Sequence, residues 1–228
     1  MLRIFGLLLL FSPVTLSCQS TYGFKVNLGA SRIPALFETS PTPYQMTDRH
    51  VPQLSGQAGV FLNISNGKRF TFGTEIIISY VAGRQQLWME LWDGTGVVGT
   101  STDVIDRWIT SVSVPVYFGM QFGKWNPNLG GEIHYAIISS GRERGNSILN
   151  GQTYSWDNGP EELNIRKFDV GLRPGVTYHF SDWIQFELNG YYGLINLVKD
   201  ESFREYADWK VQQLTVGLRW NFHGPRVV

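Results

Sequence analysis

His50, Ser101 and Asp103 come nearest to the residue types of an enzyme site. A histidine, a serine and an aspartate can perform acyl transfer, in which the serine attacks and the histidine accepts its proton. Here they lie in two separate polar stretches, 32–55 and 82–103. Stretches this polar contain such residues by chance, and a triad is defined by a geometry that spacing alone does not supply. We therefore predict that the protein is not an enzyme.

Metal ligands and basic patches are both scarce in the sequence. Cys18 is the single cysteine, and the four scattered histidines lack the Cys/His spacing of a structural zinc site. The acidic residues Asp157, Glu161 and Glu162 lack the regular oxygen-ligand spacing of a calcium loop. The 19 Lys and Arg residues balance 19 Asp and Glu residues, so the chain has no basic footprint for nucleic acid. We expect no metal, no cofactor and no nucleic-acid partner.

Residues 1–18 have the order of a secretory signal peptide: a basic residue, an apolar run and small residues before a cleavage site. The apolar run, 4–11, is too short to span a bilayer. Cys18 is either the last residue before cleavage or the lipidated first residue of a lipoprotein. Simple cleavage is favoured because Thr15 stands where a lipobox normally has leucine. We expect export from the cytoplasm and one mature domain, 19–228.

Eight segments after residue 20 alternate between apolar and polar side chains with the period of two of a β-strand. In the last segment, Leu214, Val216 and Leu218 alternate with Thr215 and Gly217. No helical period is sustained over three turns. The fold class is therefore all-β, and an even number of strands suits a closed antiparallel barrel of one chain. The segments are 22–31, 57–65, 69–80, 108–122, 129–137, 167–180, 184–194 and 213–222.

Short and long connections alternate between these segments. Tight turns fall at 66–68, 124–128 and 181–182, and the long polar stretches are 32–55, 82–103, 141–164 and 197–209. This alternation is typical of an up-and-down transmembrane β-barrel of the bacterial outer membrane, with short periplasmic turns and long extracellular loops. We therefore predict an integral outer-membrane barrel of eight strands.

The apolar face of this barrel is expected to point outward, because eight strands enclose an interior only just wide enough to be filled by side chains. The apolar faces carry too many large side chains to fit there. The polar faces instead carry small residues such as Gly73, Gly171 and Gly217, which leave room beside long charged chains. Aromatic residues gather near both ends of the strands, as at two membrane interfaces. The outward face requires outer-membrane lipid as its partner, against the alternative of a soluble lipocalin-like barrel.

The inward faces also carry charged residues of nearly balanced sign. In a narrow lumen an unpaired charge is costly, so we predict a salt-bridge network that plugs the barrel. The alternative is a charge-selective pore, for which eight strands leave almost no channel. The predicted lumen network consists of Lys25, Arg69, Glu75, Glu132, Lys167, Asp169, Arg173, Glu187 and Arg219.

Four tryptophans in the predicted loops, Trp88, Trp92, Trp156 and Trp209, are candidates for contact with an envelope protein partner. The run 87–92 still alternates above the expected membrane edge. Two interpretations stay open for it. Either this hairpin projects beyond the bilayer, or its aromatic side chains meet a partner or the lipid interface.

Several motifs resemble the short outer-membrane β-barrel proteins of Bacteroidota, a group described as porin-family or PorT-like. They are Ser111-Val112-Ser113-Val114-Pro115-Val116, Phe168-Asp169-Val170-Gly171-Leu172, Tyr192-Gly193-Leu194-Ile195-Asn196 and Val216-Gly217-Leu218-Arg219-Trp220-Asn221-Phe222. The resemblance covers nearly the whole mature chain. It implies an outer-membrane location and, through PorT itself, a link to secretion, but it assigns no catalytic residue.

The favoured function is a non-enzymatic outer-membrane barrel that binds a partner through its loops or serves as an accessory of an envelope assembly, possibly one related to secretion. A small passive pore is the alternative. A lipid A-modifying enzyme is the third hypothesis, since His50, Ser101 and Asp103 loosely resemble the loop residues of the outer-membrane lipid A palmitoyltransferase.

Overall fold

The computed structural model describes residues 19–37, 46–66, 69–199 and 207–222. The predicted signal peptide, 1–18, lies outside these ranges, and so does Cys18. No helix within them has the length and apolar character needed to cross a membrane. The described elements are β1 (Gln19–Arg32), β2 (Ala35–Phe37), β3 (Met46–Ser65), β4 (Phe70–Trp92), β5 (Val97–Met120), β6 (Trp125–Leu149), β7 (Gln152–Glu162), β8 (Phe168–His179), β9 (Ile184–Gly193), β10 (Ala207–Trp209) and β11 (Gln212–Asn221).

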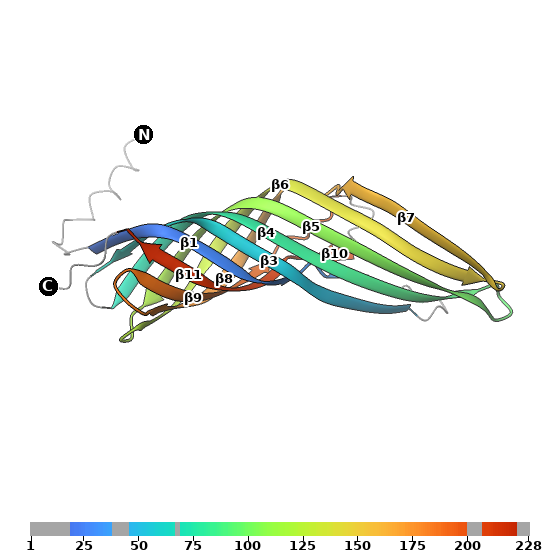
Figure 1. Cartoon of the computed structure of the whole chain (residues 1–228), viewed down its shortest axis with the longest axis horizontal. Coiled ribbons are helices and arrows are strands. Elements are labelled where there is room, and N and C mark those ends of the chain that lie inside the picture. Colours follow the sequence, from blue (N-terminus) through green and yellow to red (C-terminus); the bar gives the residue numbers. More distant parts are fainter. Residues whose placement is uncertain (1–18, 38–45, 67–68, 200–206, 223–228) are drawn as a thin grey trace, which may run out of the picture.

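Eight strands form a closed antiparallel ring in the order β1, β3, β4, β5, β6, β8, β9 and β11. The first and last strands close it, with Phe24 opposite Trp220 and Ala30 opposite Leu214. The start of β1 and the end of β11 lie at one end of the barrel, together with the short turns (Figure 1). Closure leaves no free edge in the ring, which is what a sheet inside lipid requires. The predicted eight-stranded up-and-down barrel is confirmed.

The strands are much longer than predicted at the other end of the barrel. The pairing of β4 with β5 continues from Tyr80 opposite Thr110 to Leu91 opposite Gly99. The pairing of β5 with β6 reaches Leu149, and β7 then folds back along β6. The prediction of loops at 82–103 and 141–164 is therefore wrong. These stretches are largely strand because neighbouring chain satisfies their backbone groups outside the barrel.

We call this extension the projecting sheet; it comprises 46–53 of β3, 84–92 of β4, 97–106 of β5, 141–149 of β6, and β7. Figure 1 shows it as the long tapering half of the molecule. The pairing of 87–92 with β5 agrees with the first interpretation, a projecting hairpin. Contact of its aromatic side chains with a partner stays a prediction.

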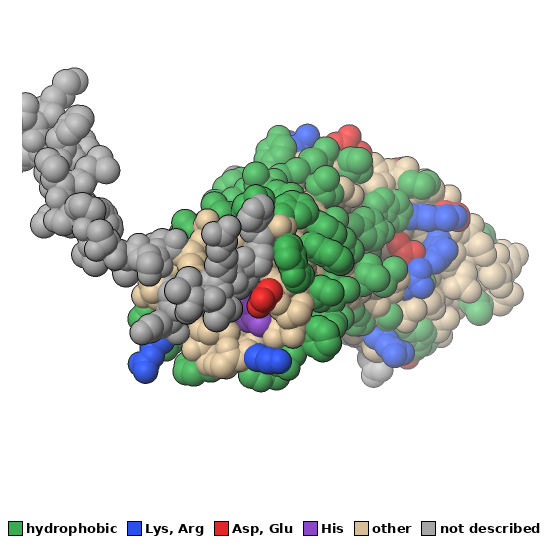
Figure 2. Space-filling model, turned by 60° about the vertical axis from the view of Figure 1, so that its left-hand side comes forward, with side chains coloured by type: hydrophobic (Ala, Val, Ile, Leu, Met, Phe, Trp, Pro, Cys, Tyr) green, Lys and Arg blue, Asp and Glu red, His purple; other side chains and the backbone are tan. Residues whose placement is uncertain are grey.

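The outer surface of the ring is apolar, and the inner surface is polar. Leu28, Ile76 and Val216 are about 60% exposed, at 60%, 60% and 59%, whereas Lys25 on the inner face is 0% exposed. Figure 2 shows the apolar side chains as a broad band across the visible face of the barrel, with most of the charged side chains in view beyond it. Such a band is stable against lipid but not against water. The predicted polar-in, apolar-out arrangement is confirmed.

Aromatic side chains lie at both edges of this band. Tyr22 and Phe222 are exposed at the short-turn end, with ring centroids 5.9 Å apart. Tyr80, Phe168 and Tyr192 are exposed at the opposite edge. These positions suit the two interfaces of a bilayer, where amphipathic rings are favoured.

An apolar layer crosses the lumen near the edge of the band that faces the projecting sheet. The sequence pattern did not predict it. Val81 of β4 and Ile109 of β5 point inward there, and Ile33 follows the end of β1. Ile165 comes from the segment before β8, and Leu197 from the segment after β9. Leu163 and Trp209 pack against its outer side. The two-stranded sheet of β2 and β10 lies beside it. The layer consists of Ile33, Val81, Ile109, Ala136, Ile165, Tyr191, Leu197 and Val211.

Candidate functional site

A layer of charged side chains fills the lumen between the short turns and the apolar layer. Each of the eight ring strands contributes one buried side chain to it, and none is more than 4% exposed. We call this the charged layer. Its members are Lys25 (β1), Phe61 (β3), Glu75 (β4), Tyr117 (β5), Glu132 (β6), Arg173 (β8), Glu187 (β9) and Arg219 (β11).

Glu75 lies at the centre of the charged layer and contacts three cations. Its carboxylate is 2.9 Å from Lys25 Nζ and 3.1 Å from Arg173 Nη2, and it also pairs with Arg219. A carboxylate buried in this way is stable only if cations compensate it. Because the partners come from strands far apart in sequence, this single residue ties four strands together.

The other two carboxylates complete the charge balance. Glu187 lies 2.5 Å from Lys25 Nζ and 3.2 Å from Arg219 Nε. Glu132 lies 3.4 Å from Arg173 Nε and 3.0 Å from the Nε2 atom of His134. The layer therefore sets three permanent cations against three carboxylates. Tyr117 accepts a hydrogen bond of 2.6 Å from Arg219 and donates one of 2.7 Å to Asn63.

Two glycines show how a narrow lumen accommodates these side chains. A Cβ atom on Gly73 would lie 2.3 Å from the Tyr117 ring, and one on Gly217 would lie 2.0 Å from Asn27 Oδ1. Real Cβ atoms do not approach so closely, so both positions need the absence of a side chain. The inward glycines therefore make room for larger neighbours, as the sequence pattern predicts.

Three of the nine predicted network residues lie outside the charged layer. Arg69 is exposed in the turn after β3, and Lys167 is exposed just before β8 begins. Both have the inward parity of their strands but stand at strand ends, where water is available. Asp169 is buried, but it accepts a 2.8 Å hydrogen bond from Tyr191 and shares none of the described ion pairs. The prediction that these three join the network is corrected accordingly.

The four tryptophans have two different environments. Trp88 and Trp92 are 37% and 39% exposed on β4 of the projecting sheet, and Trp156 is partly buried on β7. Trp209, in contrast, packs against the apolar layer and lies beneath a guanidinium group, with Arg107 Cζ 4.2 Å from its ring centroid. Trp209 therefore serves packing at the mouth of the barrel, and the other three are the side chains available outside it.

The residues considered for acyl transfer are not assembled into a triad. His50 lies opposite Gln85, and its Nε2 is 3.2 Å from Asp48 Oδ2. Ser101 and Asp103 lie on the same face of the sheet, on β5 and further from the barrel. No hydrogen bond among the described residues joins His50 to Ser101, and none of the described His, Cys, Asp and Glu residues form a group of three that could hold a metal ion.

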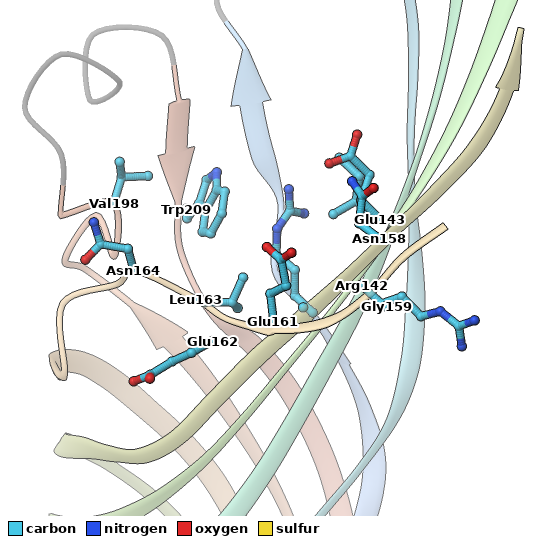
Figure 3. A pocket seen from close by; sticks show the side chains of 13 residues that line it. Arg142, Glu143, Asn158, Gly159, Glu161, Glu162, Leu163, Asn164, Val198 and Trp209 are labelled. Atoms are coloured by element: carbon cyan, nitrogen blue, oxygen red, sulfur yellow. The ribbon is translucent and has the colours of Figure 1, made fainter. Parts of the chain in front are cut away.

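A pocket of about 470 Å³ opens at the base of the projecting sheet, above the apolar layer. Figure 3 shows its lining side chains: Trp209, Leu163 and Val198 form one side, and Glu143 and Asn158 lie on the other. The Glu161 side chain points into the space between them, whereas Arg142 points away. The remaining lining residues are Ile105, Arg107, Gly141, Gly159, Glu162 and Asn164. Sequence reasoning missed this site, because its residues come from stretches assigned to separate loops.

The fold and the filled lumen together define a closed transmembrane β-barrel. The chain belongs to the outer membrane protein beta-barrel domain family, whose model matches residues 18–199. Membership in this family implies a place in the bacterial outer membrane. No curated protein sequence matches the chain.

Two solved barrels are similar to the chain in structure. One is Ail, the attachment invasion locus protein of Yersinia pestis, crystallised with the heparin analogue sucrose octasulfate; it shares 12% identity at a TM-score of 0.41, and the alignment covers 90% of this chain and 99% of Ail. The other is Neisserial surface protein A, with 12% identity, a TM-score of 0.39, and coverage of 90% and 99%. At such identities the likeness concerns the fold alone.

Proposed function

We propose that this protein is a non-conducting, non-enzymatic outer-membrane barrel that binds an envelope protein partner through its projecting sheet. The observation that carries the proposal is the projecting sheet itself, in which four ring strands, β3 to β6, continue beyond the lipid-facing band and β7 pairs with β6. A barrel that needed only to span the membrane would gain nothing from strands of this length. Ordered strands outside the membrane present a defined surface.

The projecting sheet has free hydrogen-bonding edges, unlike the ring below it. Within the described residues, β7 pairs only with β6, and 46–52 of β3 pair only with β4. Unpaired strand edges can accept an extended segment of another protein. Apolar side chains near the tip add binding surface, because Trp88, Trp92 and Tyr154 are all at least one-third exposed, at 37%, 39% and 51%.

The filled lumen argues against ion conduction, and so against the alternative of a passive pore. The charged layer and the apolar layer lie in series across it, and both are made of buried side chains. An ion would have to displace a neutralised network and then cross a layer made mainly of aliphatic side chains. Kinship with PorT-like barrels of Bacteroidota, and with it a role beside a secretion assembly, is the finer form of the proposal and rests on the sequence motifs.

The test is extraction from native outer membranes in mild detergent, followed by mass spectrometry of proteins that copurify in stoichiometric amount. We expect a partner that is lost from Trp88→Ala and Trp92→Ala. Trp183→Ala is the matched control, because Trp183 is 52% exposed at the short-turn end. Purification of the wild-type chain alone contradicts the proposal. In that case conductance recordings and a lipid A assay of His50→Ala decide between the pore and the enzyme.

A further inference from the structure

The pocket at the base of the projecting sheet contains a buried cation, Arg107, that makes no direct ion pair with a carboxylate among the described residues. Arg107 is 3% exposed and lines the pocket. Its Nη1 donates a 2.9 Å hydrogen bond to Gln85, but its Nε has no hydrogen-bond partner. No ion pair among the described residues includes this guanidinium group, which lies over the Trp209 ring. The Asp48 and Glu143 carboxylates act on this cation electrostatically but do not contact it, so an anionic group in the pocket that pairs with it directly would be favoured.

Other side chains of the same pocket have the opposite charge. Glu161 points into the space, and Glu143 lies across from it (Figure 3). A ligand with only an anionic group would meet these two carboxylates unfavourably, and a ligand with only a cationic group would leave Arg107 unpaired. A molecule with both charges satisfies each side.

The remaining walls specify the rest of the ligand. Leu163, Val198 and the Trp209 ring form an apolar side that would accept an aliphatic side chain. The volume, about 470 Å³, is within the usual range for small-molecule sites. We propose that this pocket binds a zwitterion of the amino-acid or short-peptide class, with its carboxylate on Arg107, its ammonium group on Glu143 and Glu161, and an apolar side chain on the opposite wall.

The apolar layer determines what happens to such a ligand. Ile109, two residues from Arg107 on the same face of β5, belongs to the layer that closes the lumen below the pocket. A charged molecule held above that layer has no polar path onward. The site therefore captures its ligand at the mouth of the barrel and does not transport it.

The test is calorimetric titration of the full chain, refolded in detergent, with tri-leucine and two blocked forms. One form carries an acetylated amino terminus, and the other an amidated carboxyl terminus. We expect the free peptide to bind, and each blocked form to bind at least about tenfold more weakly, since hydrogen bonds to charged groups have effects of this size. Absence of binding by the free peptide, or equal binding of all three, overturns the proposal.

Substitutions assign the two ends of the peptide. Arg107→Gln should weaken the free peptide about tenfold or more and leave the amidated form unchanged, because that form has already lost the carboxylate. Glu161→Gln should weaken binding of the free peptide and leave binding of the acetylated form unchanged, because that form has already lost the ammonium group. A merely structural role would weaken all forms equally, and this result would refute the assignment. Arg142→Gln is the matched control, since Arg142 lines the pocket but points away and pairs with Asp157. If Arg107→Gln does not fold, Arg107→Lys is the alternative variant, since it keeps the charge. It should weaken binding by a smaller factor, and only for the two peptides that carry a free carboxylate, the unblocked and the acetylated forms.

Discussion

Replacing Glu75 by glutamine removes the central carboxylate of the charged layer and nearly preserves its shape. In the wild-type protein this carboxylate pairs with Lys25, Arg173 and Arg219. The substitution leaves three cations against the two carboxylates of Glu132 and Glu187, so one buried positive charge is uncompensated. Removing one partner of a buried ion pair typically costs about 3–5 kcal/mol. The unfolding equilibrium should therefore shift by roughly 100- to 4,000-fold.

The assay is urea-induced unfolding of the barrel refolded into lipid vesicles, followed by tryptophan fluorescence. A second substitution separates charge from packing: Lys25→Met added to Glu75→Gln leaves two cations against two carboxylates, and should recover part of the lost stability. Asp157→Asn is the control, since it breaks an exposed pair with Arg142 and should change little. A loss below about 1 kcal/mol for Glu75→Gln, or no recovery in the double variant, would refute the compensation argument.

Four further outcomes are expected. Gly217→Ala should lower stability by about 1–3 kcal/mol through overpacking, whereas Gly131→Ala, whose Cβ would have its nearest neighbour at 3.9 Å, should not. Ile109→Ala should cost about 2–5 kcal/mol in the same unfolding assay, because it opens a cavity in the apolar layer. Planar bilayers containing the wild-type protein should show no discrete conductance steps. Burial, and then the Glu143 carboxylate, raise the pKa of Asp103 in the projecting sheet. Carbon NMR should find the pKa of Asp103 above its ordinary range in the wild-type protein and closer to that range in Glu143→Gln. Because the folded-state pKa is raised, the projecting sheet should become less stable as pH rises through it and Asp103 ionises.

The part of the fold that faces lipid could be predicted from the sequence. Alternation in segments such as 213–222 has high contrast, because one face lies in hydrocarbon and the other in a polar lumen. That contrast gives both the number of strands and the direction of each face. The contrast weakens in the projecting sheet, where the outer face meets water and the buried face mixes polar and apolar side chains such as Gln85, Leu87 and Asp103. β7, with the sequence Gln-Thr-Tyr-Ser-Trp-Asp-Asn-Gly-Pro-Glu-Glu, has almost no contrast and therefore gave no strand signal.

The lumen could be predicted only in part. Parity gives the inward face of Lys25 and Arg69 alike, but it does not give depth. Arg69 is at a strand end and reaches water, whereas Lys25 is enclosed. The ion-pair partners could not be predicted from the sequence either, since Glu75 and Arg219 lie 144 residues apart and meet only because the ring closes. The apolar layer was missed because Ile109, an inward aliphatic residue between Trp108 and Thr110, breaks the pattern that marks the outward face.

The charge balance of the lumen supports our proposal that binding takes place on the projecting sheet. Six buried charges in the lumen are tolerated because they neutralise one another, and groups committed to that balance are not free to act on a ligand. The projecting sheet is stabilised by other interactions than the lumen. Its ion pairs, such as Arg84 with Asp106, are partly exposed and add little, so its shape depends mainly on backbone pairing. Its side chains can therefore change without loss of the fold, and selection for binding can act on them. Arg107 stands at the boundary between these two regions. It is buried like the lumen residues, but among the described residues it makes no direct ion pair with the carboxylates near it, Asp48 and Glu143.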